Sequence, residues 1–169
     1  IVDAGGVNSP IRQRFADAFG ANIGETRNKF TWLGAETPLD AFTFFFRETP
    51  QGLICAHTYQ YEKGRSTWVV ETTPECWEAS GFGELDDVQS ADRLSDIFAE
   101  ELKGHRFITN RSVWRNFPTI TCESWSHKNI VLLGDCKATA HWSIGSGTKL
   151  AMECAIALSD AVINHEGDA

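Results

Sequence analysis

The chain has 169 residues, of which 42% are hydrophobic, and a formal net charge of −8. This length and apolar content suit a globular domain with a core of its own. Because no run of Lys or Arg occurs, the composition disfavours nucleic acid and anionic membrane surfaces as partners. No signal peptide or long apolar span is visible, so we expect a cytoplasmic chain.

The first half of the chain predicts a short helix followed by a meander of strands. Residues 1–9 read as a strand end and a Gly-rich turn, and residues 10–19 as a helix with a proline in its first turn. Three strand-like runs follow at 41–48, 52–61 and 66–72. Their connections are short and turn-like, which predicts antiparallel pairing of neighbours.

The next part predicts two helices and a pair of strands. Pro74 begins a short helix, and residues 90–103 carry apolar side chains at helical spacing on one face. Residues 111–125 predict a strand pair that is interrupted at Pro118.

A buried strand and a helix are expected at the C-terminal end. Residues 130–133 form a short apolar run, typical of a strand buried on both faces, and Gly134-Asp135 ends it. Residues 143–164 predict a helix entered through Gly145-Ser146-Gly147-Thr148. A carboxylate at a strand end followed by a helix N-terminus suits a ligand with hydroxyls and an electron-rich group.

Two segments of the chain resemble one enzyme family. The stretch from Val131 to Glu153 is similar to the Gly-Asp motif of the para-hydroxybenzoate-hydroxylase-like flavoprotein monooxygenases. Residues 4–9, followed by Arg12, resemble that family's Ala-Asp-Gly-x-x-Ser…Arg segment. The likeness covers nearly the whole chain and is greatest to the branch that hydroxylates aryl-CoA thioesters such as anthraniloyl-CoA or salicylyl-CoA. It implies an oxidoreductase that uses FAD, takes NAD(P)H as reductant and acts on an aromatic or aryl-CoA molecule.

The resemblance also implies site residues. Asp135 matches the family's contact to the ribityl or ribose part of FAD, and the backbone of Gly145–Thr148 matches the helix start that faces the flavin pyrimidine. The implied cofactor-binding residues are therefore Gly134, Asp135, Gly145, Ser146, Gly147, Thr148 and Arg12. The implied substrate-binding residues are His57, Tyr59 and Phe44. No catalytic side chain or metal ligand is assigned, because the chemistry belongs to the cofactor.

The implied fold is α+β. It consists of an antiparallel substrate-side sheet with flanking helices, a remnant of the FAD-binding parallel sheet, and a long C-terminal helix. The implied domains are residues 1–26 and 127–169, both from the FAD-binding domain, and residues 27–126, the substrate-side sheet. Alternation puts Phe42, Phe44 and Phe46 on one face of a strand, but the sequence leaves open whether that face looks into the pocket.

The sequence also departs from the family where a cofactor would lie. The usual strand–Gly-x-Gly-x-x-Gly–helix unit is not present, and Gly5 stands where the family has Asp. Cys136-Lys137-Ala138 replaces two small residues and a His, and Cys154 replaces an acidic residue. We therefore expect a core fragment of a ring hydroxylase that neither binds FAD tightly nor turns over alone. We also expect it to self-associate through exposed strand edges.

Other interpretations remain open at this point. The chain suits a re-purposed or engineered scaffold or self-associating binding module, or a flavoprotein completed by a separate N-terminal chain. A nucleophilic pair of Cys136 with His141, or an activated Lys137, is conceivable. The five cysteines are widely spaced without a C-x-x-C pair, which predicts free thiols rather than a metal site. Residues 145–149 lack the order of a phosphate-binding loop.

Overall fold

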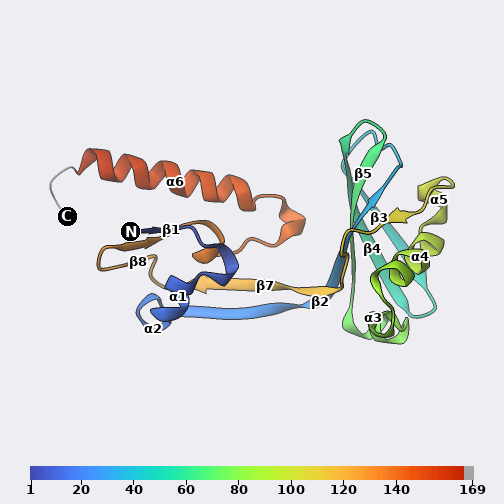
Figure 1. Ribbon diagram of the computed structural model, residues 1–169, viewed down its shortest axis with the longest axis horizontal. Coiled ribbons are helices and arrows are strands. Elements are labelled where there is room, and N and C mark those ends of the chain that lie inside the picture. Colours follow the sequence, from blue (N-terminus) through green and yellow to red (C-terminus); the bar gives the residue numbers. More distant parts are fainter. Residues whose placement is uncertain (166–169) are drawn as a thin grey trace. The chain divides into compact units, whose positions relative to one another are not determined.

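A computed structural model of the protein describes residues 1–165, which divide into two compact units (Figure 1). Unit 1 comprises Ile1–Glu25 and the chain from Pro118 onward, and unit 2 comprises Thr26–Phe117. The chain passes from one unit to the other along strands β2 (Ala21–Ala35) and β7 (Arg115–Cys122), which pair with each other. The assignment of residues 1–26, 27–126 and 127–169 to a cofactor and a substrate domain stays a prediction.

Unit 1 contains the expected parallel strand pair. β1 (Val2–Asp3) runs parallel to β9 (Ile130–Leu132), and β8 (Ser126–His127) pairs antiparallel with β9. The predicted early helix is present as α1 (Pro10–Arg14) and α2 (Ala16–Phe19). The core of the unit is built from Phe19, Ile130, Leu132 and Cys136.

The long C-terminal helix α6 (Gly147–Asn164) begins later than the sequence predicts. A single turn of 3-10 helix (Trp142–Ile144) precedes it, and Gly145 then takes a left-handed conformation with φ of 67°. This conformation interrupts helical hydrogen bonding, so the helix starts two residues further on. No residue of α6 within Gly147–Asn164 is buried, although many of its side chains are apolar.

The antiparallel meander lies in unit 2, as predicted. β3 (Thr43–Thr49), β4 (Gly52–Glu62) and β5 (Arg65–Thr72) pair in chain order. β2 pairs antiparallel with β5, and β6 (Phe107–Ile108) pairs with β2. The order across the sheet is β3-β4-β5-β2-β6. Together with unit 1, this confirms the α+β fold.

Helices cover one face of the meander. α3 (Pro74–Ala79) follows β5, and α4 (Asp87–Ile97) and α5 (Ala99–Leu102) come next (Figure 1). α4 starts with a capping box in which Asp86 and Gln89 each bond the other's backbone N–H. Side chains of these helices pack on the sheet in a shared core that includes Trp68, Val70, Leu94, Phe98 and Leu102.

Two strand predictions need correction. The sequence predicts a strand pair broken at Pro118, but β7 runs through Pro118 as one strand. A proline is tolerated there because β7 pairs with β2 along one edge, so the missing N–H need not interrupt a ladder. The 15-residue strand β2 was not predicted.

Among residues 1–165, none of the helices combines the length and apolar character needed to cross a membrane.

Candidate functional site

The predicted cofactor residues of unit 1 gather around the start of α6. β9 leads through Leu133 into Gly134, whose φ is 61°, and Asp135 follows in an exposed turn. A Cβ at position 134 would lie 3.3 Å from the Cβ of Ala151, so glycine permits a close approach of this loop to α6. Two cavities flank the contact, with volumes of about 160 and 450 Å³.

Both cavities are lined by Gly134, Asp135 and Gly147, and the larger one also by Thr148. The hydroxyl of Ser146 donates to the carbonyl of Ile144 and does not cap α6. A Cβ added to Gly147 would meet no atom within 4 Å, so the space beside the first turn is open. The predicted residues Gly145 and Ser146 precede the helix without lining either cavity. The arrangement offers a carboxylate and helix N–H groups to a ligand.

Arg12 occupies a different environment from these residues. Its side chain is 1% exposed, and its guanidinium donates to the carbonyls of Val7 and Cys136, the latter over 3.1 Å. These bonds tie the turn after β1 to the turn after β9. Its predicted contact with a cofactor stays a prediction.

Asp3 explains why glycine occupies position 5. The carboxylate of Asp3 accepts hydrogen bonds from the Gly5 N–H, at 2.9 Å, and from the Ser9 hydroxyl. A Cβ at position 5 would lie 2.9 Å from the same carboxylate, so a larger residue would displace it. The turn therefore still has a carboxylate, which comes from Asp3 instead of the Asp that the family has at position 5.

Two departures from the family pattern, Lys137 and Cys154, meet in the smaller cavity. Lys137 is 8% exposed, and its ammonium lies 2.7 Å from the Cys154 sulfur and 3.6 Å from the ring centroid of Trp125. Aromatic contact of this kind stabilises a poorly solvated cation. The sequence shows each substitution but not their pairing, which depends on the loop lying against α6.

Cys136 does not form the considered nucleophile pair with His141. Its thiol is buried and donates to the carbonyls of Asp3 and Leu133, while His141 Nδ1 lies 2.7 Å from the Ser143 hydroxyl. Burial raises the pKa of Cys136, which favours the unreactive thiol. This residue is part of the packing of unit 1.

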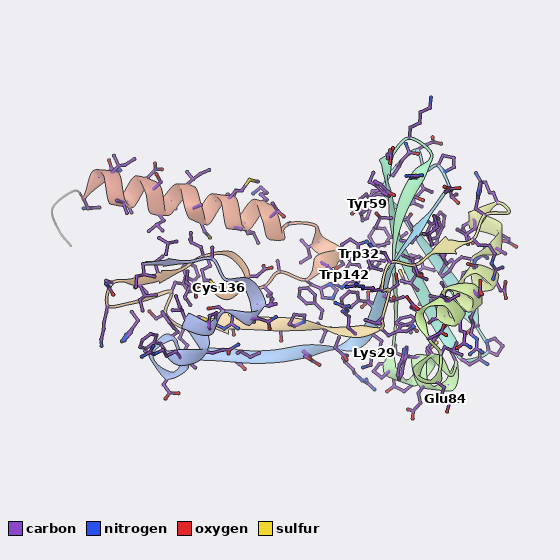
Figure 2. The ribbon with its side chains drawn as sticks, in the orientation of Figure 1. Lys29, Trp32, Tyr59, Glu84, Cys136 and Trp142 are labelled. Atoms are coloured by element: carbon purple, nitrogen blue, oxygen red, sulfur yellow. The ribbon has the colours of Figure 1, made fainter. Side chains whose placement is uncertain are left out.

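The predicted substrate residues of unit 2 share the sheet face turned away from the helices. Strand register aligns Phe44, His57, Val69 and Trp32 across β3, β4, β5 and β2. Figure 2 shows Trp32 and Tyr59 on the side away from α4 and α5. The face whose role the sequence left open, with Phe42, Phe44 and Phe46, is thus the one that α4 and α5 leave uncovered.

Aromatic rings contact one another along this face. The Phe44 ring meets His57 edge-on at 4.4 Å between centroids, and stacks with Phe46 at 6.4 Å. Phe42 stacks with Tyr59 at 6.1 Å. At the β2 side of the sheet, Trp32 borders a cavity of about 370 Å³. The structure therefore brings the buried His57 together with the exposed rings of Tyr59 and Phe44 on one face of the sheet.

A polar pair lies within this surface, and Glu71 is its unpredicted member. Glu71 Oε2 is 3.5 Å from His57 Nε2, and Asn28 Nδ2 donates to Glu71 Oε1 at 2.9 Å. Glu71 aligns with Cys55 on β4 and Phe30 on β2. The sequence signal is a charged residue that directly follows an apolar run in a largely buried strand, at a position that alternation places on the same face as Val69.

The chain is similar in sequence to parts of curated monooxygenases. No protein-family model matches it. It is 38% identical, over 96% of its length, to salicyloyl-CoA 5-hydroxylase of Streptomyces, and spans 33% of that protein. It is 40% identical, again over 96% of its length, to 3-hydroxy-4-methyl-anthranilyl-[aryl-carrier protein] 5-monooxygenase of Streptosporangium sibiricum, and spans 42% of it. The chain thus spans less than half of these relatives.

Solved structures share the fold. A probable FAD-dependent monooxygenase of Pseudomonas aeruginosa matches 97% of the chain with a TM-score of 0.65 and 23% identity, over 46% of its own length. The tetrameric form of 2-methyl-3-hydroxypyridine-5-carboxylic acid oxygenase matches 99% of the chain with a TM-score of 0.75 and 16% identity, over 45% of its own length.

Proposed function

We propose that this chain, which is homologous to part of the aromatic monooxygenases and has the fold of their FAD-dependent members, is the core of an aromatic ring hydroxylase. In this proposal FAD contacts the two cavities at the start of α6, which are lined by Gly134, Asp135 and Gly147 and are called the cleft below. The aromatic face of unit 2 that α4 and α5 leave uncovered contacts the substrate ring. The observation that carries it is the array of Phe42, Phe44, Tyr59 and Trp32 around the Glu71–His57 pair.

The residues of the cleft fit a flavin. Gly147 leaves open space beside a helix start that has no side-chain cap, and Asp135 lines both adjoining cavities. Asp135 would accept hydrogen bonds from ligand hydroxyls, and the N–H groups of Gly147 and Thr148 would donate to an electron-rich ring edge. When bound, reduced flavin with NAD(P)H as its source of electrons would supply the oxygen-activating chemistry.

We expect FAD to bind weakly to this chain by itself. The cleft supplies one carboxylate and one helix N-terminus, and a hydrogen bond to a charged group contributes about 1.5–3 kcal/mol. Two or three such contacts give about 3–9 kcal/mol, which corresponds to a Kd between about 6 mM and 0.3 μM. Lys137 and Cys154 fill part of the smaller cavity, where the family has smaller or acidic residues.

The substrate face suits a planar ring that carries polar groups. Exposed aromatic side chains offer offset or edge-on stacking to a ring. The names of the two curated relatives contain aromatic acyl groups, a salicyloyl and a 3-hydroxy-4-methyl-anthranilyl group. We extend this class to the chain and propose a benzoyl-type ring with hydroxyl or amino groups, attached to coenzyme A or a carrier.

A flavin titration tests the cofactor part of this proposal. Saturable quenching of FAD fluorescence by the wild-type chain is expected, with affinity reduced about tenfold or more in Asp135→Asn, because a charged acceptor is lost. Asp160→Asn is the matched control, since Asp160 is exposed on α6 and lines neither cavity. Equal affinities of the two variants, or no binding at all, would contradict an Asp135 contact with the cofactor.

A further inference from the structure

We propose that Glu71 determines substrate specificity, by accepting a hydrogen bond from a hydroxyl or amino group on the substrate ring. This inference rests on the proposed function, because it assumes that the ring lies on the aromatic face of unit 2. It adds a named acceptor to a surface that is rich in aromatic rings. Asn28 and His57 act as positioning residues, which hold the Glu71 carboxylate.

The place of Glu71 in the sheet supports this role. β4 and β5 form the middle of the face, while Phe44 and Phe46 on β3 and Trp32 on β2 flank them. Glu71 is on β5, where it aligns with Phe30 on β2 and Cys55 on β4, and its carboxylate faces the His57 ring. Its side chain is 16% exposed, so a ligand on this face can reach it while bulk water is largely excluded.

The hydrogen bonding of Glu71 leaves capacity for a ligand. An ionised carboxylate has about four lone-pair sites. Asn28 occupies one at 2.9 Å, and His57 approaches another oxygen at 3.5 Å, longer than an ordinary hydrogen bond. The two contacts restrict rotation of the carboxylate without saturating it. A partly desolvated acceptor of this kind strongly disfavours a ring that brings no donor, since its own hydration would be lost without replacement.

Paired ligands separate ring binding from donor recognition. The probes are 2-, 3- and 4-hydroxybenzamide and the corresponding methoxybenzamides, in which methylation removes the donor and keeps the ring. Affinities are measured by NMR titration of the ligand ring protons with the wild-type chain. At least one hydroxybenzamide is expected to bind about tenfold or more tightly than its methyl ether.

Variants then assign the preference to Glu71. Glu71→Gln should reduce the ratio between hydroxy and methoxy ligands toward one, because the neutral amide is a weaker acceptor for the hydroxyl and costs less to desolvate beside the ether. Glu48→Gln is the matched control, because Glu48 is an exposed glutamate on β3 outside the Asn28–His57 contacts, and it should keep the ratio. Asn28→Ser should reduce the ratio severalfold, an effect on selectivity that a purely structural role would not produce.

The outcomes distinguish the inference from the proposed function. If rings bind but wild type shows no preference, or Glu71→Gln retains it, the inference is overturned and ring binding stands. If no benzamide binds, the proposed substrate face is itself overturned, and the inference with it. Thermal unfolding checks that Glu71→Gln is folded, and if it is not, the ratio measured with Asn28→Ser decides.

Discussion

At the scale of single residues, positions 137 and 154 show how two substitutions become one feature. A buried lysine ammonium needs a compensating partner, because its desolvation is costly. Lys137 has Cys154 at 2.7 Å and the face of Trp125 at 3.6 Å. The sequence shows both as departures from the family pattern, but their pairing depends on the loop after β9 lying against α6.

Cys55 provides a residue-scale prediction of pH dependence. Burial, and to a smaller extent the charge of Glu71, raise the pKa of this thiol to about 11 from 9.0. Since the thiolate is the nucleophile, alkylation of Cys55 by iodoacetamide should be slow at neutral pH and increase as the pH rises toward 11. Mass spectrometry of time points resolves Cys55 from the other four cysteines.

The contribution of Glu71 to this behaviour has a matched control. Glu71→Gln removes the nearby negative charge, so the pKa of Cys55 should fall and its alkylation at pH 8–9 should accelerate severalfold. Glu48→Gln should leave the rate as in wild type. An unchanged rate in Glu71→Gln would mean that burial accounts for the whole shift.

At the scale of elements, local pattern predicts some strands and misses others for physical reasons. The runs that became β3, β4 and β5 alternate or are rich in β-forming residues, and short turns separate them. β2 has no such pattern in its first half, where polar residues predominate and most side chains are exposed. It exists because β7 and β5 pair with it, and such long-range pairing leaves little trace in a local window.

Gly20, which connects α2 to β2, gives an element-scale prediction. Its φ of 56° costs an alanine about 1 kcal/mol or more, and an added Cβ would lie 2.7–2.8 Å from side-chain atoms of Glu123. Gly20→Ala should therefore destabilise unit 1 by about 2–4 kcal/mol. Hydrogen exchange of the β9 amides measures this loss.

Gly6→Ala is the control for the conformational part of that loss. Gly6 has a φ of 69°, is also in unit 1, and has no atom within 4 Å of an added Cβ. Its substitution should cost only about 1 kcal/mol. Equal losses in the two variants would show that Glu123 moves aside freely and that the steric argument is wrong.

At the scale of the whole molecule, the sequence predicts the class of fold. The α+β class follows from the family resemblance, the meander and the strand–loop–helix around Asp135 follow from local pattern, and the structure has them all. The two units are not contiguous in sequence, since unit 1 is made from both ends of the described chain. For the substrate face, alternation identifies Phe44 with Phe42 and Phe46, but only packing of α4 and α5 shows which face is uncovered.

The surface of α6 leads to a prediction about self-association. Ile156 and Ile163 are 62% and 63% exposed, they are seven residues apart, and they lie on one side of the helix. β1 is moreover an edge strand of its sheet within residues 1–165. Exposed apolar stripes and strand edges favour association, so the sedimentation coefficient of the wild-type chain should rise with concentration. Ile156→Glu combined with Ile163→Glu should suppress that rise.

Ala157→Glu combined with Asn164→Glu is the control. It adds the same charges at the same spacing without removing a large apolar side chain, and it should suppress the rise less. If both pairs abolish association equally, charge rather than the apolar stripe governs it, and a sedimentation coefficient independent of concentration in the wild type would contradict association altogether.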